Sequence, residues 1–209
     1  ILKTMGFELF DQYGAVKKQS ADEQKRIKQT LLEYQKIWPR VDAHIRIAMK
    51  WVEGDDFKTL LKQFIRPLLI KGVPSVIQAM KEFYADDAKI AIIQEVLFEF
   101  LASMDKQMTL DPTDKQEQDP TVYLWLVYFI SYHFMFLRDN ENALKFVNKG
   151  IEHTPTLIDL YTLKGKIMQQ AGDRVEAARL FEEARALDTA DRALNAISAC
   201  YQVKAGKIE

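Results

Sequence analysis

Apolar residues recur along most of the chain at the three- and four-residue spacing of amphipathic helices, and polar turns separate these stripes. A capping-box pair, Ser20 and Glu23, predicts a helix start, and the stripe that follows extends to Trp38. A weaker stripe covers residues 41–51. Residues 1–14 carry the same helical spacing and predict a further helix that closes at a glycine. The N-terminal part of the chain is therefore expected to be helical.

Two prolines modify the helices predicted next. Residues 57–69 form a strong amphipathic stripe, but Pro67 should kink or end that helix near Arg66, because proline lacks an amide hydrogen and clashes with the preceding turn. A turn follows, and Pro74 suits the first position of the next predicted helix, residues 76–84.

An acidic pair and a polar loop delimit the following helix. Asp86 and Asp87 predict its N-terminal cap, and its apolar stripe extends to Met108. Residues 111–120 contain two prolines and no apolar residue, which predicts an exposed loop and the main boundary within the chain. We expect residues 1–110 to form divergent helical repeats.

The remaining residues, 121–209, repeat themselves at a spacing of 34 positions. The equivalent pairs are Ser131 and Gly165, Phe134 and Met168, Ala143 and Ala177, Val147 and Phe181, Gly150 and Ala184, and Pro155 and Thr189. A third copy places Ala199 after Gly165 and Gly206 after Gly172. This period, with small residues where two helices approach closely, is typical of the tetratricopeptide unit, a pair of antiparallel helices that stacks on its neighbours. The predicted fold is all-α, a tetratricopeptide-type helical-repeat superhelix (α-solenoid) with two complete repeats and a truncated third in this part.

Composition narrows the class of protein. A hydrophobic content of 48% with 28% charged residues favours an ordered, packed chain. The net charge of -1 gives no overall attraction to nucleic acid or to an anionic membrane. The single cysteine, Cys200, fits a reducing compartment, so a cytoplasmic location is expected. The apolar segment 122–137 is shorter than the ~20 residues that a membrane span requires. Because the chain starts at Ile1 and stops just after a predicted turn, we expect an internal piece of a longer protein.

The chain offers little that could perform catalysis. Its three histidines, His44, His133 and His153, lie far apart and show neither metal-ligand spacing nor a pairing with a nucleophile. His133 lies within an apolar helix, where a hydrogen-bonded core histidine is favoured over a catalytic base. No glycine-rich loop suits a phosphate or acetyl-coenzyme A. We therefore predict no catalytic residues and no metal site.

A recognition surface is the function that remains. Stacked helix pairs present their first helices on a concave side that can hold a protein or peptide ligand. A small polar group near the C-terminal end could suit an anionic ligand, although lysines on helices more commonly serve solubility. Its members are Lys164, Lys166, Tyr201 and Lys204.

Several segments resemble the auxiliary subunit of the N-terminal acetyltransferase A (NatA) complex. The run Ala186 to Arg192, ALDTADR, carries the resemblance most specifically, because Thr189 stands where generic repeats usually have proline. Residues 154–160, 164–167, 171–173 and 176–179 are also similar. The same holds for residues 57–75, 83–84 and 89–95. The resemblance implies a non-catalytic helical scaffold that binds the catalytic acetyltransferase subunit and helps tether it to the ribosome. Its partner would acetylate the N-termini of nascent chains during translation.

The resemblance also implies site residues. Thr156 and Leu157, at the start of a first helix, match the family's contact with the catalytic subunit. Lys166, Tyr201 and Lys204 match part of a basic pocket for inositol hexaphosphate. Better-known members carry additional lysines where this chain has Ile197 and Cys200. Each missing charge-assisted hydrogen bond removes ~1.5–3 kcal/mol, so we expect weak binding of inositol hexaphosphate or none, and no required cofactor.

Two other classes of repeat protein serve as alternatives. A generic tetratricopeptide adaptor could grip a chaperone tail, and Lys164 and Asn195 suit such a carboxylate clamp without forming its full two-repeat arrangement. An RNA-binding helical scaffold would need a basic stripe, which the balanced charge disfavours. The NatA scaffold remains the leading hypothesis, and no sequence-specific nucleic acid or membrane partner is expected.

Overall fold

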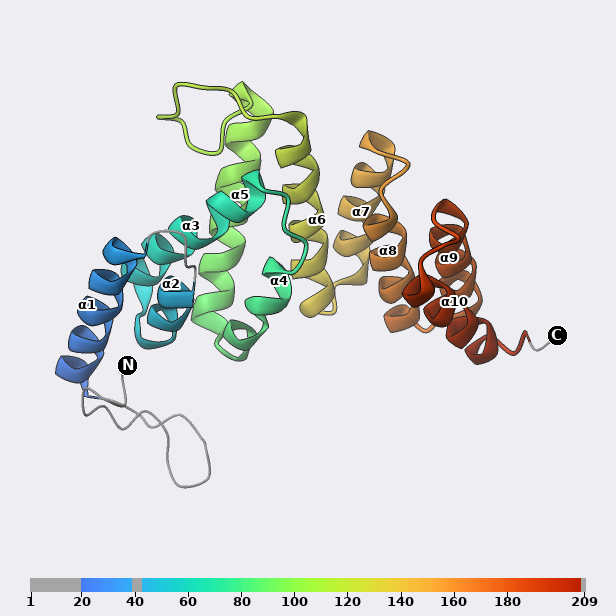
Figure 1. Cartoon of the computed structure of the whole chain (residues 1–209), viewed down its shortest axis with the longest axis horizontal. Helices are drawn as coiled ribbons and strands as arrows, with labels where there is room; N and C mark the ends of the chain where they lie inside the picture. Colours follow the sequence, from blue (N-terminus) through green and yellow to red (C-terminus); the bar gives the residue numbers. More distant parts are fainter. Residues whose placement is uncertain (1–19, 39–42, 208–209) are drawn as a thin grey trace. The chain divides into compact units, whose positions relative to one another are not determined.

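The structure, a computed structural model, describes residues 20–38 and 43–207, and within these ranges it contains helices and turns but no strand (Figure 1). The predicted all-α, helical-repeat fold class is confirmed. The helix predicted for residues 1–14 lies outside the described residues. The elements are α1 (Ala21–Ile37), α2 (Ala43–Ala48), η2 (Met49–Trp51), α3 (Gly54–Ile70), α4 (Val76–Ala79), η3 (Lys81–Ala85), α5 (Asp87–Gln107), α6 (Pro120–Phe136), α7 (Asn140–His153), α8 (Ile158–Ala171), α9 (Arg174–Leu187) and α10 (Arg192–Lys204).

The chain divides into two compact units, whose limits fall inside α3 and α5. Among the described residues, one unit comprises 20–38, 43–67 and 85–93, and the other comprises 68–84 and 94–207. The polar loop before α6 does not separate them. It joins α5 and α6, and Phe98 of α5 contacts Phe134 of α6 edge to face within the second unit, with ring centroids 6.2 Å apart.

In the first unit, α1 begins at the predicted capping box. The Ser20 amide donates to the Glu23 carboxylate at 3.0 Å, and the Glu23 amide donates to Ser20 Oγ at 3.3 Å. Its buried side chains are those of Ile27 and Leu31, and α1 packs against α2. The weak stripe at residues 41–51 forms the short helix α2 and the 3-10 turn η2, with residues 39–42 outside the described part.

For α3, the sequence predicts a kink or an end near Arg66, and of these two outcomes the structure excludes the end. The helix continues past Pro67 to Ile70. Leu68 and Leu69 are 7% and 0% exposed, and burial of each contributes roughly 1.5–3 kcal/mol, which offsets the ~3 kcal/mol that a proline in a helix costs. Burial of the last turn therefore outweighs the loss of one amide hydrogen.

The helix predicted for residues 76–84 is also different in the structure. It is split into the four-residue α4 and the 3-10 helix η3, and Pro74 precedes the N-cap Ser75 instead of opening the helix. Ile77, Met80 and Phe83 are all buried, and their three-residue spacing matches the period of a 3-10 helix. In a continuous α-helix, neighbours three positions apart would still share a face, but Ile77 and Phe83 would diverge by about 120°.

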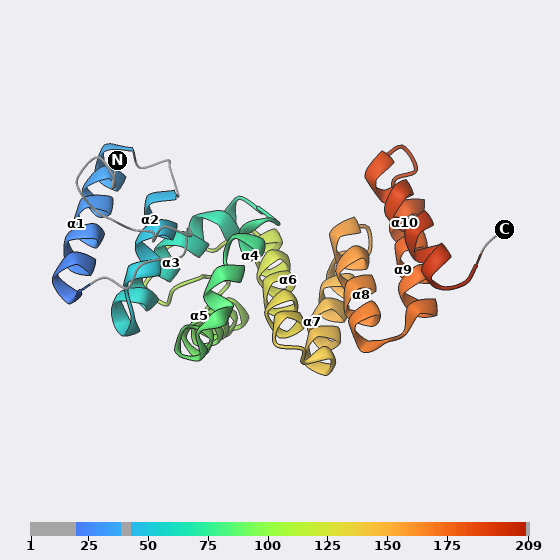
Figure 2. The same cartoon turned by 90° about the horizontal axis from the view of Figure 1, so that it is seen from below.

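In the second unit, the predicted pairs of helices are present: α6 packs on α7, α8 on α9, and α9 on α10 (Figure 2). Small residues explain the 34-residue period. Ser131 Oγ donates to the Ala143 carbonyl at 2.9 Å, which joins α6 to α7. A Cβ at the equivalent Gly165 would lie 2.8 Å from the Phe181 ring, so only glycine allows α8 to approach α9 this closely.

Helix α6 is the most deeply buried helix of the repeats. Asp119 caps it by accepting from the Thr121 amide at 2.8 Å, and Pro120 is its first residue. Most of its side chains from Val122 to Phe134 are buried. No described helix, α6 included, has the length and apolar character that crossing a membrane requires.

Candidate functional site

The two residues predicted to bind a catalytic partner lie in the turn between α7 and α8. Thr156 is exposed, and Leu157 is partly exposed and forms the N-cap of α8 without a side-chain hydrogen bond. The turn is held by its backbone, since the Leu157 amide donates to the Thr154 carbonyl at 3.3 Å. Tyr161 Oη also donates to the Pro155 carbonyl at 2.8 Å. Both side chains are thus presented on a fixed turn, which suits contact with another protein.

Lys166 lies on α8 and is directed toward α6. Its Nζ donates to Tyr132 Oη at 3.1 Å and lies 5.7 Å from the centroid of that ring. The same hydroxyl accepts from Gln78 Nε2 at 3.3 Å. Burial raises the pKa of the nearby Asp159 carboxyl, and the positive charge of Lys166 partly opposes that rise. Lys166 therefore belongs to a polar cluster formed by α4, α6 and α8.

Tyr201 and Lys204 lie together on α10. Lys204 Nζ is 4.6 Å from the centroid of the Tyr201 ring, and that ring stacks on Phe181 with centroids 4.0 Å apart. Lys166 makes no hydrogen bond or ring contact with either residue in the part of the chain that the structure describes. Of the three residues proposed for a polyphosphate, the structure thus brings two into contact.

Lys164 and two further positions on α10 add little positive charge for an anion. The charge of Lys164 interacts with Glu176, a carboxylate on α9 whose pKa is lowered mainly by its hydrogen bonds from Arg179. Ile197 is 39% exposed and Cys200 is exposed, so the two positions that lack a lysine are on the surface of α10. An anion approaching this helix would meet few cations.

The structure also contains a buried polar network that the sequence predicted only in part. His133 is 0% exposed, its Nδ1 is 2.8 Å from Tyr84 Oη, and its Nε2 is 3.2 Å from Gln94 Oε1. Burial lowers the pKa of His133 to about 4 and raises that of Tyr84. The prediction of a hydrogen-bonded core histidine is confirmed. Its partners could not be inferred, because 49 and 39 positions separate them from His133 along the chain.

The described residues include no group of three histidine, cysteine, aspartate or glutamate side chains with the geometry to hold a metal ion. Their distinctive features are the exposed turn before α8, the Lys166 cluster and the Tyr201–Lys204 pair. All of these could recognise another molecule, and they lie on or next to first helices of the repeats.

Comparison with known proteins identifies the family. The model of the family "N-terminal acetyltransferase A, auxiliary subunit" matches residues 6–209. N-alpha-acetyltransferase 16, the NatA auxiliary subunit of Mus musculus, is 35% identical over 178 residues, which are 85% of this chain and 21% of that protein. The NatA complex auxiliary subunit NAA15 of Arabidopsis thaliana is 32% identical over 187 residues, 90% of this chain and 20% of that protein.

A solved structure shows the same fold. It is described as Naa15/Naa10 bound to HypK-THB, and the matched chain has a TM-score of 0.80 and 29% identity over 90% of this chain. This chain spans about a fifth of the length of the curated relatives and 27% of the chain in that structure. Since the family model covers nearly the whole sequence, the chain belongs to the family of N-terminal acetyltransferase A auxiliary subunits.

Proposed function

We propose that this chain acts as part of a non-catalytic scaffold, which binds the catalytic subunit of N-terminal acetyltransferase A and positions it for co-translational acetylation of nascent N-termini. The family match over residues 6–209 carries this proposal. It is supported by the similar fold of a chain whose structure is described as a complex of Naa15 with Naa10. A scaffold of this kind leaves acetyl transfer to its partner, and we place it in the cytoplasm at the ribosome.

The turn before α8 supports a direct role in binding the catalytic subunit. Thr156 and Leu157 present their side chains from a backbone that is already ordered, so little conformational entropy remains to be lost on binding. The Leu157 side chain makes no capping hydrogen bond at the start of α8. We propose that a partner helix or loop covers this turn.

Inositol hexaphosphate is proposed as a weak ligand and not as a required cofactor. Tyr201 and Lys204 lie together, but Lys166 is engaged with Tyr132, and Ile197 and Cys200 supply no charge. A polyphosphate needs several charge-assisted hydrogen bonds at once. The available cations on α10 therefore favour low affinity.

Co-purification with the matching catalytic subunit tests the proposed function. Thr156→Glu should reduce recovery of the complex at least tenfold, because a carboxylate would be buried without a partner at the interface. The matched control is Ala190→Glu, which introduces the same residue 34 positions later, at another exposed turn position. Equal recovery of the wild-type protein and Thr156→Glu would rule out this turn as the contact. No association of the wild-type protein would favour a general tetratricopeptide adaptor.

A further inference from the structure

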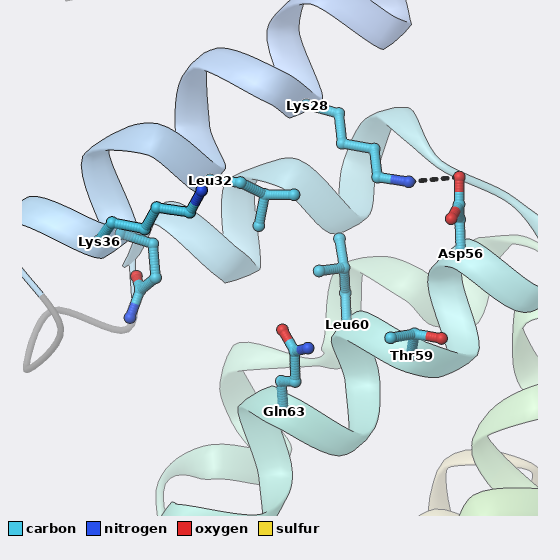
Figure 3. A pocket seen from close by; sticks show the side chains of 8 residues that line it. Lys28, Leu32, Lys36, Asp56, Thr59, Leu60 and Gln63 are labelled. Carbon is cyan, nitrogen blue, oxygen red and sulfur yellow. Dashed lines mark ion pairs between the residues drawn. The ribbon is translucent and has the colours of Figure 1, made fainter.

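The first unit contains a groove between α1 and α3 that has no role in the proposed function. The volume of this groove is about 410 Å³, which is within the size range of ligand-binding pockets, ~300–1,000 Å³. Figure 3 shows Leu32 of α1 and Leu60 of α3 directed into the space between the two helices. Its lining residues are Lys28, Leu32, Gln35, Lys36, Asp56, Thr59, Leu60 and Gln63.

The two walls of the groove have matching patterns. On α1, Lys28, Leu32 and Gln35 follow one another at positions i, i+4 and i+7, so they lie on one face of the helix. On α3, a charged residue, a leucine and a glutamine again follow at the same spacing; they are Asp56, Leu60 and Gln63. The groove therefore has a charged end, an apolar middle and an amide-bearing end.

The charged end is neutralised within the protein. Lys28 and Asp56 form an ion pair across the groove, shown by the dashed line in Figure 3. This pair joins α1 to α3 and leaves no net charge at that end. A ligand thus gains little by placing a charged group there.

The opposite end carries an unpaired cation. Lys36 is exposed, and its Nζ makes no hydrogen bond or ion pair with the residues that the structure describes. Lys36 lies one helical turn beyond Leu32, a rise of about 6 Å along the axis. The groove therefore offers an apolar surface at Leu32 and Leu60 and a positive charge about 6 Å away.

Extended peptide geometry matches this distance. Two residues of an extended chain span about 6.6 Å, and side chains two positions apart point to the same side. We propose that the α1–α3 groove binds an extended segment of a partner protein that carries a bulky apolar side chain and, two residues away, a carboxylate. The apolar side chain packs against Leu32 and Leu60, and the carboxylate pairs with Lys36. The neighbouring glutamines can hydrogen-bond the backbone of the segment.

Fluorescence polarisation with labelled synthetic peptides and the purified full-length protein tests this proposal. The probes are Gly/Ser decapeptides with one leucine and one glutamate, which are separated by one, two or three positions in either order. A two-residue separation should give at least fivefold tighter binding than the other spacings in one of the orders. Raising the salt concentration should weaken this binding, because it depends on an exposed ion pair.

Protein variants identify the groove as the binding site. Leu32→Asp should abolish binding of the best peptide, whereas Ile37→Asp should not, since Ile37 is an exposed apolar residue of the same helix outside the groove. Lys36→Glu should weaken binding at least fivefold and should restore binding of a peptide in which lysine replaces glutamate. Lys145→Glu, the same charge reversal at an exposed position of α7, is the matched control. Circular dichroism shows whether each variant remains folded.

Several results would overturn the proposal. Equal affinity for all peptides would mean that the groove does not distinguish the spacing between the leucine and the glutamate. Unchanged affinity in folded Lys36→Glu would remove the proposed ion pair. If the wild-type protein self-associates in sedimentation experiments and Leu32→Asp does not, the groove binds a second copy of the chain. If the peptide binds only after deletion of residues 1–19, the groove is occupied by that segment. None of these results bears on the proposed binding of the catalytic subunit at Thr156 and Leu157, which belong to the second unit.

Discussion

At the scale of single residues, burial controls the charge of His133. The side chain is 0% exposed, and its two ring nitrogens lie within hydrogen-bonding distance of the Tyr84 hydroxyl and the Gln94 side-chain oxygen. A neutral imidazole can donate from Nε2 to Gln94 and accept from Tyr84 at Nδ1. Protonation would add a charge inside the buried part of the repeat, away from water, which is why burial lowers the pKa to about 4.

The stability of the repeats should therefore decrease in mild acid. Because the folded-state pKa of His133 lies below its unfolded value of 6.5, the contribution of this group is fully present above pH 6.5 and is lost as pH falls toward 4. Between pH 7.5 and 4.5 this residue alone should lower the free energy of unfolding by about 2–3 kcal/mol. Urea unfolding at a series of pH values measures the change.

Two variants separate this effect from other titrations. His133→Gln should be less stable at neutral pH but should show a flatter pH dependence. His153→Gln removes an exposed histidine at the end of α7 and is the matched control. A wild-type pH dependence in His133→Gln would mean that another group is responsible.

The orientation of a side chain was the feature that sequence could least predict. The repeat period correctly placed Lys166, Tyr201 and Lys204 on first helices. It could not show that Lys166 donates to Tyr132, since that contact depends on which neighbouring helix the flexible side chain meets. Because Tyr132 lies inside an apolar run of the sequence, there was also no sign in the sequence that its hydroxyl accepts a hydrogen bond.

At the scale of helices, the small residues of the repeat decide how closely two helices approach. Gly165→Ala should destabilise the protein by about 1–3 kcal/mol, even though alanine favours helix more than glycine does. The added Cβ would lie 2.8 Å from the Phe181 ring, which is itself stacked on Tyr201 and cannot easily move. Thermal and urea unfolding measure the cost.

The equivalent position of the third copy is the matched control. Ala199 is exposed, so Ala199→Gly should cost only the helix propensity, about 0.5–1 kcal/mol. Adding Phe181→Leu to Gly165→Ala should recover part of the lost stability if the ring is the obstacle. Equal effects at both positions would show that packing does not determine the choice of glycine.

The surface of α10 should accept a polyphosphate once its charge is restored. Ile197→Lys combined with Cys200→Lys should raise affinity for inositol hexaphosphate at least tenfold, since each charge-assisted hydrogen bond contributes roughly 1.5–3 kcal/mol. Isothermal titration calorimetry measures this change. Gln29→Lys with Thr30→Lys on α1 adds the same charge elsewhere and should have no such effect. A tight wild-type complex would contradict our expectation of weak binding.

Local signals predicted helices well where they agreed with burial. The capping box of α1 and the Asp119 cap of α6 lie at the ends of apolar stripes, and both helices begin there. At Pro67 the helix does not end, and residues 76–84 do not form the continuous helix that the local signals predicted. Burial of Leu68 and Leu69 extended α3 beyond the proline, and the three-residue spacing of buried side chains produced a 3-10 helix after α4.

At the scale of the whole chain, the structure consists of two compact units that share α3 and α5. The sequence placed its main boundary at the polar loop 111–120, because composition changes most sharply there. However, a polar composition indicates that a segment is exposed to solvent, and it does not indicate which helices pack together. The helices on either side of the loop are joined by contacts of Phe98 with Phe134 and of Gln94 with His133.

Because each repeat mainly contacts its neighbours, a destabilising substitution in one repeat should affect only the helices close to it. Native-state hydrogen exchange of Gly165→Ala tests this expectation. Amides of α8, α9 and α10 should exchange faster than in the wild type, because the variant separates α8 from α9 and disturbs the Phe181–Tyr201 stack. Amides of α1 and of the first turns of α3 should keep their wild-type rates, since they belong to the other compact unit. A uniform increase along the chain would instead indicate that the two units unfold together, and the α1–α3 groove would then lose its shape whenever the repeats open.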